Sequence, residues 1–252
     1  MCGRYSVTAL PEALRTHFGY EGQPNFPPRY NIAPAQPIGI VRQVDGKRHF
    51  VLVRWGLLPS WVKNPRTFSL LINARGETVM EKPAFRAAMK RRRCLIPATG
   101  FYEWQADGDR KRPFYIRAKS GTALAFAGLW ETWTGPNGEE VETAAIVTTH
   151  ANSTLSAIHD RMPVIVPPEA FDLWLDCVNV DALTAGALIR PAPDDLLEAY
   201  EISTAVNRTT NDTSKVQEPV APSEIQPERV KRRAPHPRAR RPKKDDGQGT
   251  LF

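Results

Sequence analysis

The chain has 252 residues, of which 41% are hydrophobic and 24% charged, so it can bury a core and is not disordered throughout. It has no apolar run of about 18 residues and no apolar segment after a basic start, which argues against a membrane span and a secretory signal. Its three cysteines, Cys2, Cys94 and Cys177, are widely spaced, which argues against a disulfide framework or a metal site and favours a reducing, cytoplasmic location.

The formal net charge is +7, and more than half of this excess lies near the C-terminus. Residues 216–252 are rich in proline and in basic side chains, nine of which fall between Arg229 and Lys244. We therefore predict a folded domain over residues 1–215 and a disordered basic tail over residues 216–252. Such a tail attracts phosphate backbones without reading their sequence, but it can equally serve only to keep the protein soluble.

Apolar alternation and turn residues predict more strands than helices in the folded part. Short helices are expected over residues 10–18, 83–91, 168–175 and 181–188. Strands are expected over residues 38–44, 49–55, 94–97, 114–117, 123–129, 141–148, 164–166 and 200–206. The first two strands flank a hairpin turn at Asp45-Gly46, and most of the others are also hairpin-linked. The fold class is therefore α+β, with a largely antiparallel, barrel-like sheet and flanking short helices.

Cys2 directly follows the initiator Met1, which is generally removed when the second residue is small. Removal would leave a thiol and an α-amino group two carbons apart, and both have usable nucleophilic fractions near neutral pH. This 1,2-aminothiol can trap an aldehyde, first as an imine and then as a thiazolidine ring. The alternative is an incidental cysteine in a frayed N-terminus.

Two further side chains are candidates for proton transfer. Glu103 lies among large rings in Phe101-Tyr102-Glu103-Trp104, where partial desolvation would raise its pKa. His159 begins a polar cluster within apolar sequence, and histidine is the usual proton shuttle near neutral pH. A surface glutamate and a structural histidine are the alternatives.

A third group of residues suits contact with nucleic acid. Asn73 and Arg75 would share a face of a strand, where both can meet one phosphate or sugar. Arg4 and Arg161 add positive charge. Tryptophan rings can stack on unpaired bases, and the candidates, with core packing as their alternative, are Trp61 and Trp104.

Six short motifs, in this order along residues 2–215, resemble the SOS-response-associated peptidase (SRAP) family, also called the abasic-site-processing proteins. They are Met1-Cys2-Gly3-Arg4-Tyr5, Trp55-Gly56-Leu57-Leu58-Pro59-Ser60-Trp61, Asn73-Ala74-Arg75, Cys94-Leu95-Ile96-Pro97, Gly100-Phe101-Tyr102-Glu103-Trp104 and His159-Asp160-Arg161-Met162-Pro163. One departure is Gly76, where the family usually has alanine.

The resemblance implies a barrel-like fold with a basic channel for single-stranded DNA that contains abasic sites. It implies that Cys2 captures the ring-opened abasic sugar as a thiazolidine and so shields the site. Asn73 would position the Cys2 end, Glu103 would deprotonate its amine, and His159 would act as acid and base. The family's phosphate contacts would correspond to Arg4, Arg75 and Arg161.

No metal or organic cofactor is expected, and we expect a monomer associated with the nucleoid. Two alternatives belong to other functional classes. One is a thiol-dependent peptidase, including one that acts only on its own Met1. The other is a non-catalytic single-strand DNA-binding module in which Cys2 is incidental.

The chain ends in Gln248-Gly249-Thr250-Leu251-Phe252. The pattern of Gln248, Leu251 and Phe252 resembles the short peptide with which bacterial repair proteins bind the sliding clamp. Leu251 and Phe252 on a flexible tail can serve as two apolar anchors in a hydrophobic pocket, and the amide of Gln248 can fix the register. The alternative is an ordinary chain end.

Overall fold

The computed structural model describes residues 2–22 and 25–220, and its centre is a closed ring of five strands. The ring runs β10–β4–β3–β6–β9 and closes because β9 also pairs with β10. Its strands are β3 (Pro37–Val44), β4 (Lys47–Trp55), β6 (Arg93–Ala98), β9 (Leu124–Thr134) and β10 (Glu140–His150). All neighbours in the ring are antiparallel except β4 and β10, which are parallel. The α+β class and the barrel-like, largely antiparallel core are thus confirmed.

Two short strands extend the ring beside β10. They are β5 (Asn73–Arg75), which runs parallel to β10, and β11 (Arg161–Pro163), which runs antiparallel to it. The sequence pattern placed a strand at residues 164–166 instead. The shift arises because residues 161–163 take the pairing with β10, after which the chain turns towards β9, with Val166 donating to the carbonyl of Ala125.

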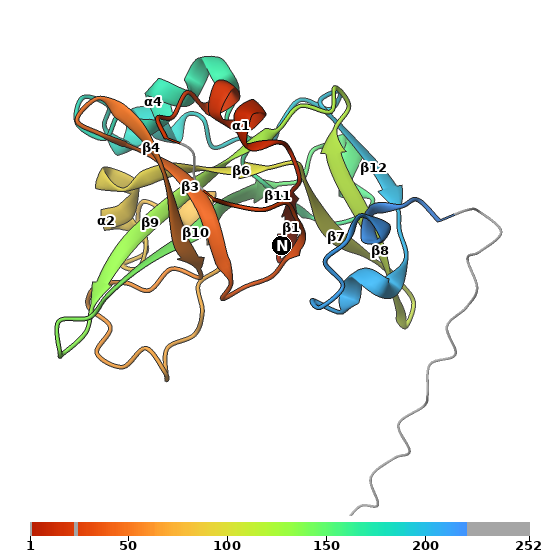
Figure 1. Ribbon diagram of the computed structural model, residues 1–252, viewed down its shortest axis with the longest axis horizontal. Coiled ribbons are helices and arrows are strands. Elements are labelled where there is room, and N and C mark those ends of the chain that lie inside the picture. Colours follow the sequence, from red (N-terminus) through yellow and green to blue (C-terminus); the bar gives the residue numbers. More distant parts are fainter. Residues whose placement is uncertain (1, 23–24, 221–252) are drawn as a thin grey trace, which may run out of the picture.

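The second sheet has five strands in the order β12–β8–β7–β1–β2 and lies to the right of the barrel in Figure 1. Its strands are β1 (Tyr5–Val7), β2 (Arg29–Ile32), β7 (Gly100–Asp107), β8 (Arg110–Ala118) and β12 (Leu197–Glu201). The first strand of the chain therefore lies inside this sheet, between β2 and β7. This arrangement fixes the chain immediately after Cys2.

The last strand begins earlier than the predicted residues 200–206. It ends at Glu201 because Ser203 accepts a hydrogen bond from the backbone of Ala205 and starts a 3-10 turn, η3 (Thr204–Asn207). Packed structure also continues past residue 215. Val216, in the 3-10 turn η4 (Ser214–Gln217), is buried, and Pro219 bridges to Ile202. The predicted tail otherwise lies outside the described residues.

Short helices cover the outside of the barrel, as predicted. They are α1 (Pro11–Phe18), α2 (Arg86–Arg91), α3 (Ser153–Ser156), α4 (Phe171–Leu175) and α5 (Ala182–Gly186), with 3-10 turns η1 (Gly76–Thr78) and η2 (Pro168–Ala170). Phe18 of α1 stacks on Phe171 of α4 at 5.5 Å between ring centroids, which joins the two helices seen above the barrel in Figure 1. Within the described residues no helix is both long and apolar enough to span a membrane.

Candidate active site

Cys2 lies inside the protein just before β1, and its side chain is fully buried. Its thiol is 3.9 Å from the carbonyl oxygen of Arg4, and its own carbonyl accepts a hydrogen bond of 2.9 Å from Nδ2 of Asn73. Burial, with a smaller contribution from the charge of Glu103, raises the pKa of the thiol well above its usual range. Cys2 is therefore a fixed, protonated thiol, and the frayed-terminus alternative is wrong.

Glu103 is an interior residue of β7, next to the fully buried Tyr102. Only 4% of its surface is exposed. Burial raises the pKa of its carboxyl group from 4.5 to about 7. The surface-glutamate alternative is wrong, and at neutral pH this carboxyl group exists about equally as acid and base.

His159 faces Glu103 from the segment between α3 and β11, with its Nε2 3.9 Å from Oε2 of Glu103. Its Nδ1 lies 3.0 Å from the backbone nitrogen of Arg161 and 2.8 Å from Oδ1 of Asp160. The backbone N–H requires an unprotonated Nδ1, whereas the carboxylate would require a protonated one. Burial lowers the pKa of His159, and Asp160 is largely exposed, so we assign the neutral ring with its proton on Nε2.

The separation between His159 and Glu103 is longer than a hydrogen bond, so a third polar group can bridge the two side chains. The carboxyl group of Glu103, a base with a pKa near 7, and the N–H of the neutral His159 ring then both face the same position. This pairing suits removal of a proton from one atom and delivery of a proton to another.

Asn73 and Arg75 lie on β5, on the same side of the strand as predicted, and β5 is held in place by its parallel pairing with β10. The amide nitrogen of Asn73 donates to the carbonyl of Cys2, while its Oδ1 is buried and has no hydrogen-bond partner among the described residues. The side chain of Arg75 is exposed and makes no hydrogen bond or ion pair with described residues. It is therefore available to an anionic ligand.

The other two predicted arginines have internal partners. Arg161 is 6% exposed and forms a bidentate ion pair with Glu77, at 2.6 and 2.9 Å, as well as bonds to Thr148. Arg4 donates to Asn31 and to the carbonyl oxygens of residues 206 and 207. In this structure both guanidinium groups hold segments of the site together, and contact with DNA stays a prediction for each.

The two predicted tryptophans lie in different surroundings. Trp104 lines a cleft of about 460 Å³ together with Glu103, His159, Lys111 and Asn207. Trp61 is 57% exposed in the loop between β4 and β5, where its ring and that of Phe68 form a T-shaped pair. Trp61 does not line the cleft.

Two residues of the cleft were missed by the sequence analysis. Lys111 lies on β8 opposite Ala106 of β7, and Asn207 ends the η3 turn about a hundred residues later. Neither belongs to a motif with recognisable chemistry. Only the antiparallel pairing of β7 with β8 and the anchoring of η3 bring them to Glu103.

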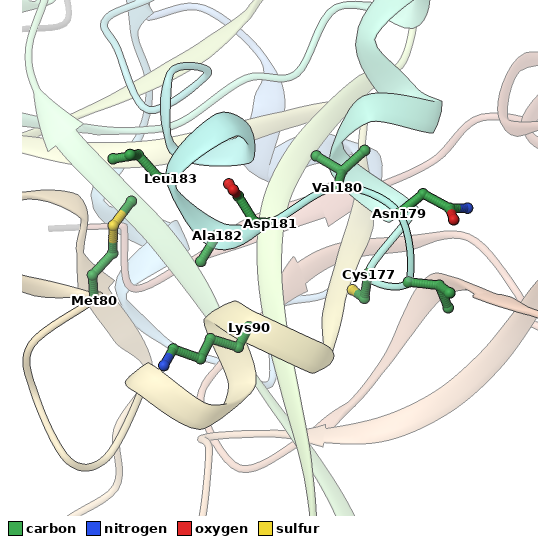
Figure 2. Close-up of a pocket in the computed structure, with 9 residues that line it drawn as sticks. Met80, Lys90, Cys177, Asn179, Val180, Asp181, Ala182 and Leu183 are labelled. Carbon is green, nitrogen blue, oxygen red and sulfur yellow. The ribbon is translucent and has the colours of Figure 1, made fainter.

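A larger hollow, of about 540 Å³, lies elsewhere on the molecule (Figure 2). It is lined by Met80, Lys90 and residues 177–183. None of the predicted site residues lines it. Among the described residues, no group of three or more His, Cys, Asp or Glu side chains is arranged to hold a metal ion.

Comparison with known proteins places the chain in a family. The family model described as "SOS response associated peptidase (SRAP)" matches residues 1–209. The chain is 37% identical to the abasic site processing protein YoqW of Bacillus subtilis, over 86% of this chain and 98% of the relative. It is 30% identical to the abasic site processing protein YedK of Escherichia coli, over 87% of this chain and 100% of the relative.

The fold comparison agrees. A protein from Bacteroides thetaiotaomicron has a crystal structure that matches with a TM-score of 0.78 at 27% identity, covering 87% of this chain and all of the other. A phage-related protein from Bordetella bronchiseptica matches with a TM-score of 0.64 at 31% identity, over 80% of this chain and 94% of the other. The chain therefore belongs to the SOS response associated peptidase (SRAP) family.

Proposed function

We propose that this protein processes abasic sites in single-stranded DNA by capturing the ring-opened sugar covalently on Cys2. The observation that carries this proposal is the fixed position of Cys2, whose carbonyl is held by Asn73. The relatives named above as abasic site processing proteins support the substrate class. The thiazolidine adduct rests on the chemistry of the residues.

The reaction begins after removal of Met1, which frees the α-amino group of Cys2. The amine adds to C1′ of the open-chain sugar, and loss of one water molecule gives an imine. The sulfur then adds to the imine carbon and closes the thiazolidine ring, while the thiol proton passes to the ring nitrogen. The net change is condensation of an aldehyde with an aminothiol, with release of one water and no redox step.

Glu103 and His159 supply the proton transfers in this scheme. Glu103, with a pKa of about 7, accepts the proton that the α-ammonium group of Cys2 must lose before the free amine can attack. The Nε2–H of neutral His159 donates to the sugar ring oxygen as the ring opens and to the departing hydroxyl as the imine forms. Burial keeps the Cys2 sulfur protonated until the imine is in place.

Exposed cationic and aromatic groups supply the DNA-binding surface. Arg75, two residues from Asn73, is the cation best placed to hold a phosphate beside the captured sugar. The exposed ring of Trp61 is a stacking platform for an unpaired base farther along the strand. Arg4 and Arg161 keep the segments that carry the site in register.

The thiol-peptidase alternative has weaker support. A cysteine peptidase needs a thiolate stabilised by a histidine. In the described residues the Cys2 thiol contacts the Arg4 carbonyl, and its pKa is raised rather than lowered. The non-catalytic alternative gives no role to the raised pKa of Glu103 or to Oδ1 of Asn73, which has no hydrogen-bond partner among the described residues.

A denaturing gel separates covalent capture from the two alternatives. Labelled single-stranded DNA with one abasic site is mixed with the wild-type protein, with Cys2→Ala, and with a variant whose tag retains Met1. We expect a covalent band with the wild type alone, while native gels show similar non-covalent binding for all three. A heat-stable adduct at wild-type yield in Cys2→Ala would contradict the proposal. The absence of any adduct with the wild type would leave only the two alternatives.

The proposed clamp contact of Gln248, Leu251 and Phe252 falls outside the described residues. The basic tail would tether the domain near the replication fork and raise its local concentration where abasic single strands arise. Polarisation of a labelled peptide covering residues 243–252, titrated with purified clamp, is the test. Equal binding after Leu251→Ala and Phe252→Ala together would refute it without affecting the capture mechanism.

A further inference from the structure

The indole of Trp104 is held in one orientation by Asn207. Its Nε1 donates a 2.8 Å hydrogen bond to Oδ1 of Asn207. The indole N–H can only donate, so the amide orientation is settled, with oxygen towards Trp104 and nitrogen away from it. Asn207 is in turn anchored through its backbone, because its carbonyl oxygen accepts from Nη2 of Arg4 at 3.1 Å.

This arrangement leaves donor groups at the cleft. The Nδ2 group of Asn207 has no acceptor among the described residues, and the residue is exposed. One part of Trp104 packs against the small core around Tyr102, and the ring also lines the cleft. A flat ring and an amide donor therefore lie side by side, beyond Glu103 and His159.

Lys111 completes the cleft with a positive charge. It is exposed on β8, forms no ion pair with described residues, and lines the same cavity. Burial is the main cause of the lowered pKa of His159, and the charge of Lys111 adds a smaller effect, which places Lys111 within electrostatic range of the site. An aromatic face, an amide donor and a cation are the groups that bind a nucleotide base and its phosphate.

We propose that Trp104, Asn207 and Lys111 form a subsite for the intact nucleotide that adjoins the abasic site. Its base stacks on Trp104, its ring acceptor receives the Asn207 amide, and its phosphate lies against Lys111. This inference rests on the proposed function, since it assigns a position on the same DNA strand. It makes capture depend on an unpaired base beside the lesion as well as on the aldehyde.

The test measures the affinity of each protein variant for each DNA lesion. Oligonucleotides carry a tetrahydrofuran analogue of the abasic site, which cannot form the adduct, and a second analogue removes the neighbouring base on the 5′ or the 3′ side. Fluorescence polarisation gives the affinities. For the wild type we expect base removal on one side to weaken binding roughly five- to hundredfold, the range of one aromatic stack. In Trp104→Ala the same removal should have no further effect.

Two Asn207 variants separate recognition from structural support. Asn207→Asp keeps an oxygen acceptor for Trp104 but loses the amide donor, whereas Asn207→Ala loses both. We expect both variants to lose most of the dependence on the neighbouring base. If Asn207→Asp behaves like the wild type while Asn207→Ala does not, the residue only supports Trp104, and its part in the subsite is overturned.

Lys111 is tested through ionic strength. Lys111→Ala should lower the slope of log affinity against log salt by about 0.7, the value for one phosphate contact on a single strand. Lys119→Ala, an exposed lysine just past the other end of β8, is the matched control and should leave the slope unchanged. Equal slopes in the two variants would remove Lys111 from the subsite.

The outcomes also separate this inference from the proposed function. If the wild type forms the covalent adduct but base removal weakens binding equally in the wild type and all variants, the proposed function stands and the subsite is refuted. A wild type that neither binds nor captures single-stranded DNA contradicts both.

Discussion

The two hollows of this protein differ in their chemistry more than in their size. The hollow in Figure 2 is the larger, at about 540 Å³ against about 460 Å³ for the cleft at Glu103. The carboxylate of Asp181, which lines this hollow, already serves the fold. Asp181 accepts from the backbone of Thr184 and caps α5, and these bonds hold the pKa of its carboxyl below the usual range.

In the cleft the pKa shift of the carboxyl group of Glu103 runs in the opposite direction. Burial raises the pKa of the Glu103 carboxyl group to about 7, so this group can exchange a proton near neutral pH, and burial lowers the pKa of His159, which favours its neutral ring. At Asp181 hydrogen bonds stabilise the ionised carboxylate and serve the helix cap, whereas at Glu103 desolvation gives the raised pKa that the proposed proton transfer requires. The volume of a cavity carries no such information.

The largest expected effect is on the rate of capture. Glu103→Gln and His159→Ala should each slow adduct formation roughly 10²–10⁴-fold, because each removes one proton-transfer group. Single-turnover quenching followed by denaturing gels measures the rate. Asp181→Asn is the matched control in the other hollow, since asparagine also caps a helix, and should react at the wild-type rate. Wild-type rates in both cleft variants would show that the wrong residues are assigned.

The second prediction concerns the dependence of stability on pH. The folded protein holds a proton on Glu103 up to a pKa of about 7, against 4.5 for the ordinary group, so it binds more protons than the unfolded chain between these values. The contribution is complete below about pH 4.5 and is lost as the pH rises through 7, by about 3 kcal/mol at most.

Glu103→Gln should therefore be more stable than the wild type at pH 8, and the two should converge near pH 5. Urea unfolding at both values checks this, with Asp181→Asn as the comparison, because the shift at Asp181 is in the opposite direction. If the difference in unfolding free energy between Glu103→Gln and the wild type is the same at pH 8 as at pH 5, the assigned burial of Glu103 is contradicted.

The smallest expected effect is on stability and concerns Gly76. A Cβ added to Gly76, in η1 just after β5, would lie 2.2 Å from Cγ2 of Ile189, which follows α5. Gly76→Ala should therefore cost roughly 1–3 kcal/mol of stability, as overpacking typically does. Ile189→Ala removes the clashing atom. The double variant should thus lose less stability than the two single changes added together, and strict additivity would contradict the contact.

This contact also explains the departure from the family pattern noted at Gly76. Alanine there requires a smaller or displaced neighbour, and in this chain position 189 carries the branched Ile189. The sequence shows both residues but not that they meet. Their separation along the chain hides the reason for the glycine.

Local features of the fold could be predicted well. The hairpin of β3 and β4 follows from Asp45-Gly46, both of which adopt the positive φ that this turn requires. A barrel-like sheet was expected, but the strands that close it could not be predicted, because closure depends on the parallel pairing of Arg54 with Thr143. No local pattern records a contact between strands so distant in sequence.

The candidate site divides in the same way. Cys2, Asn73, Glu103 and His159 were predicted from motifs, and the structure brings all four into one region. The partners of Arg161 were not predicted, since Glu77 gives no sign in the sequence that it neutralises a buried arginine. Side chains that serve the reaction leave a recognisable pattern, whereas those that hold them in place are identified only by contact.

The position of β1 in the middle of its sheet has a consequence for the timing of synthesis. Tyr5 pairs with Phe101 of β7, so the start of the chain cannot be enclosed until about a hundred further residues have been made. At roughly 5–20 residues per second, this leaves an interval of roughly 5–20 s in which the nascent N-terminus is still outside the fold. An aminopeptidase working at the ribosome can reach Met1 during that interval. A chain that leaves the ribosome untrimmed folds with its amine capped.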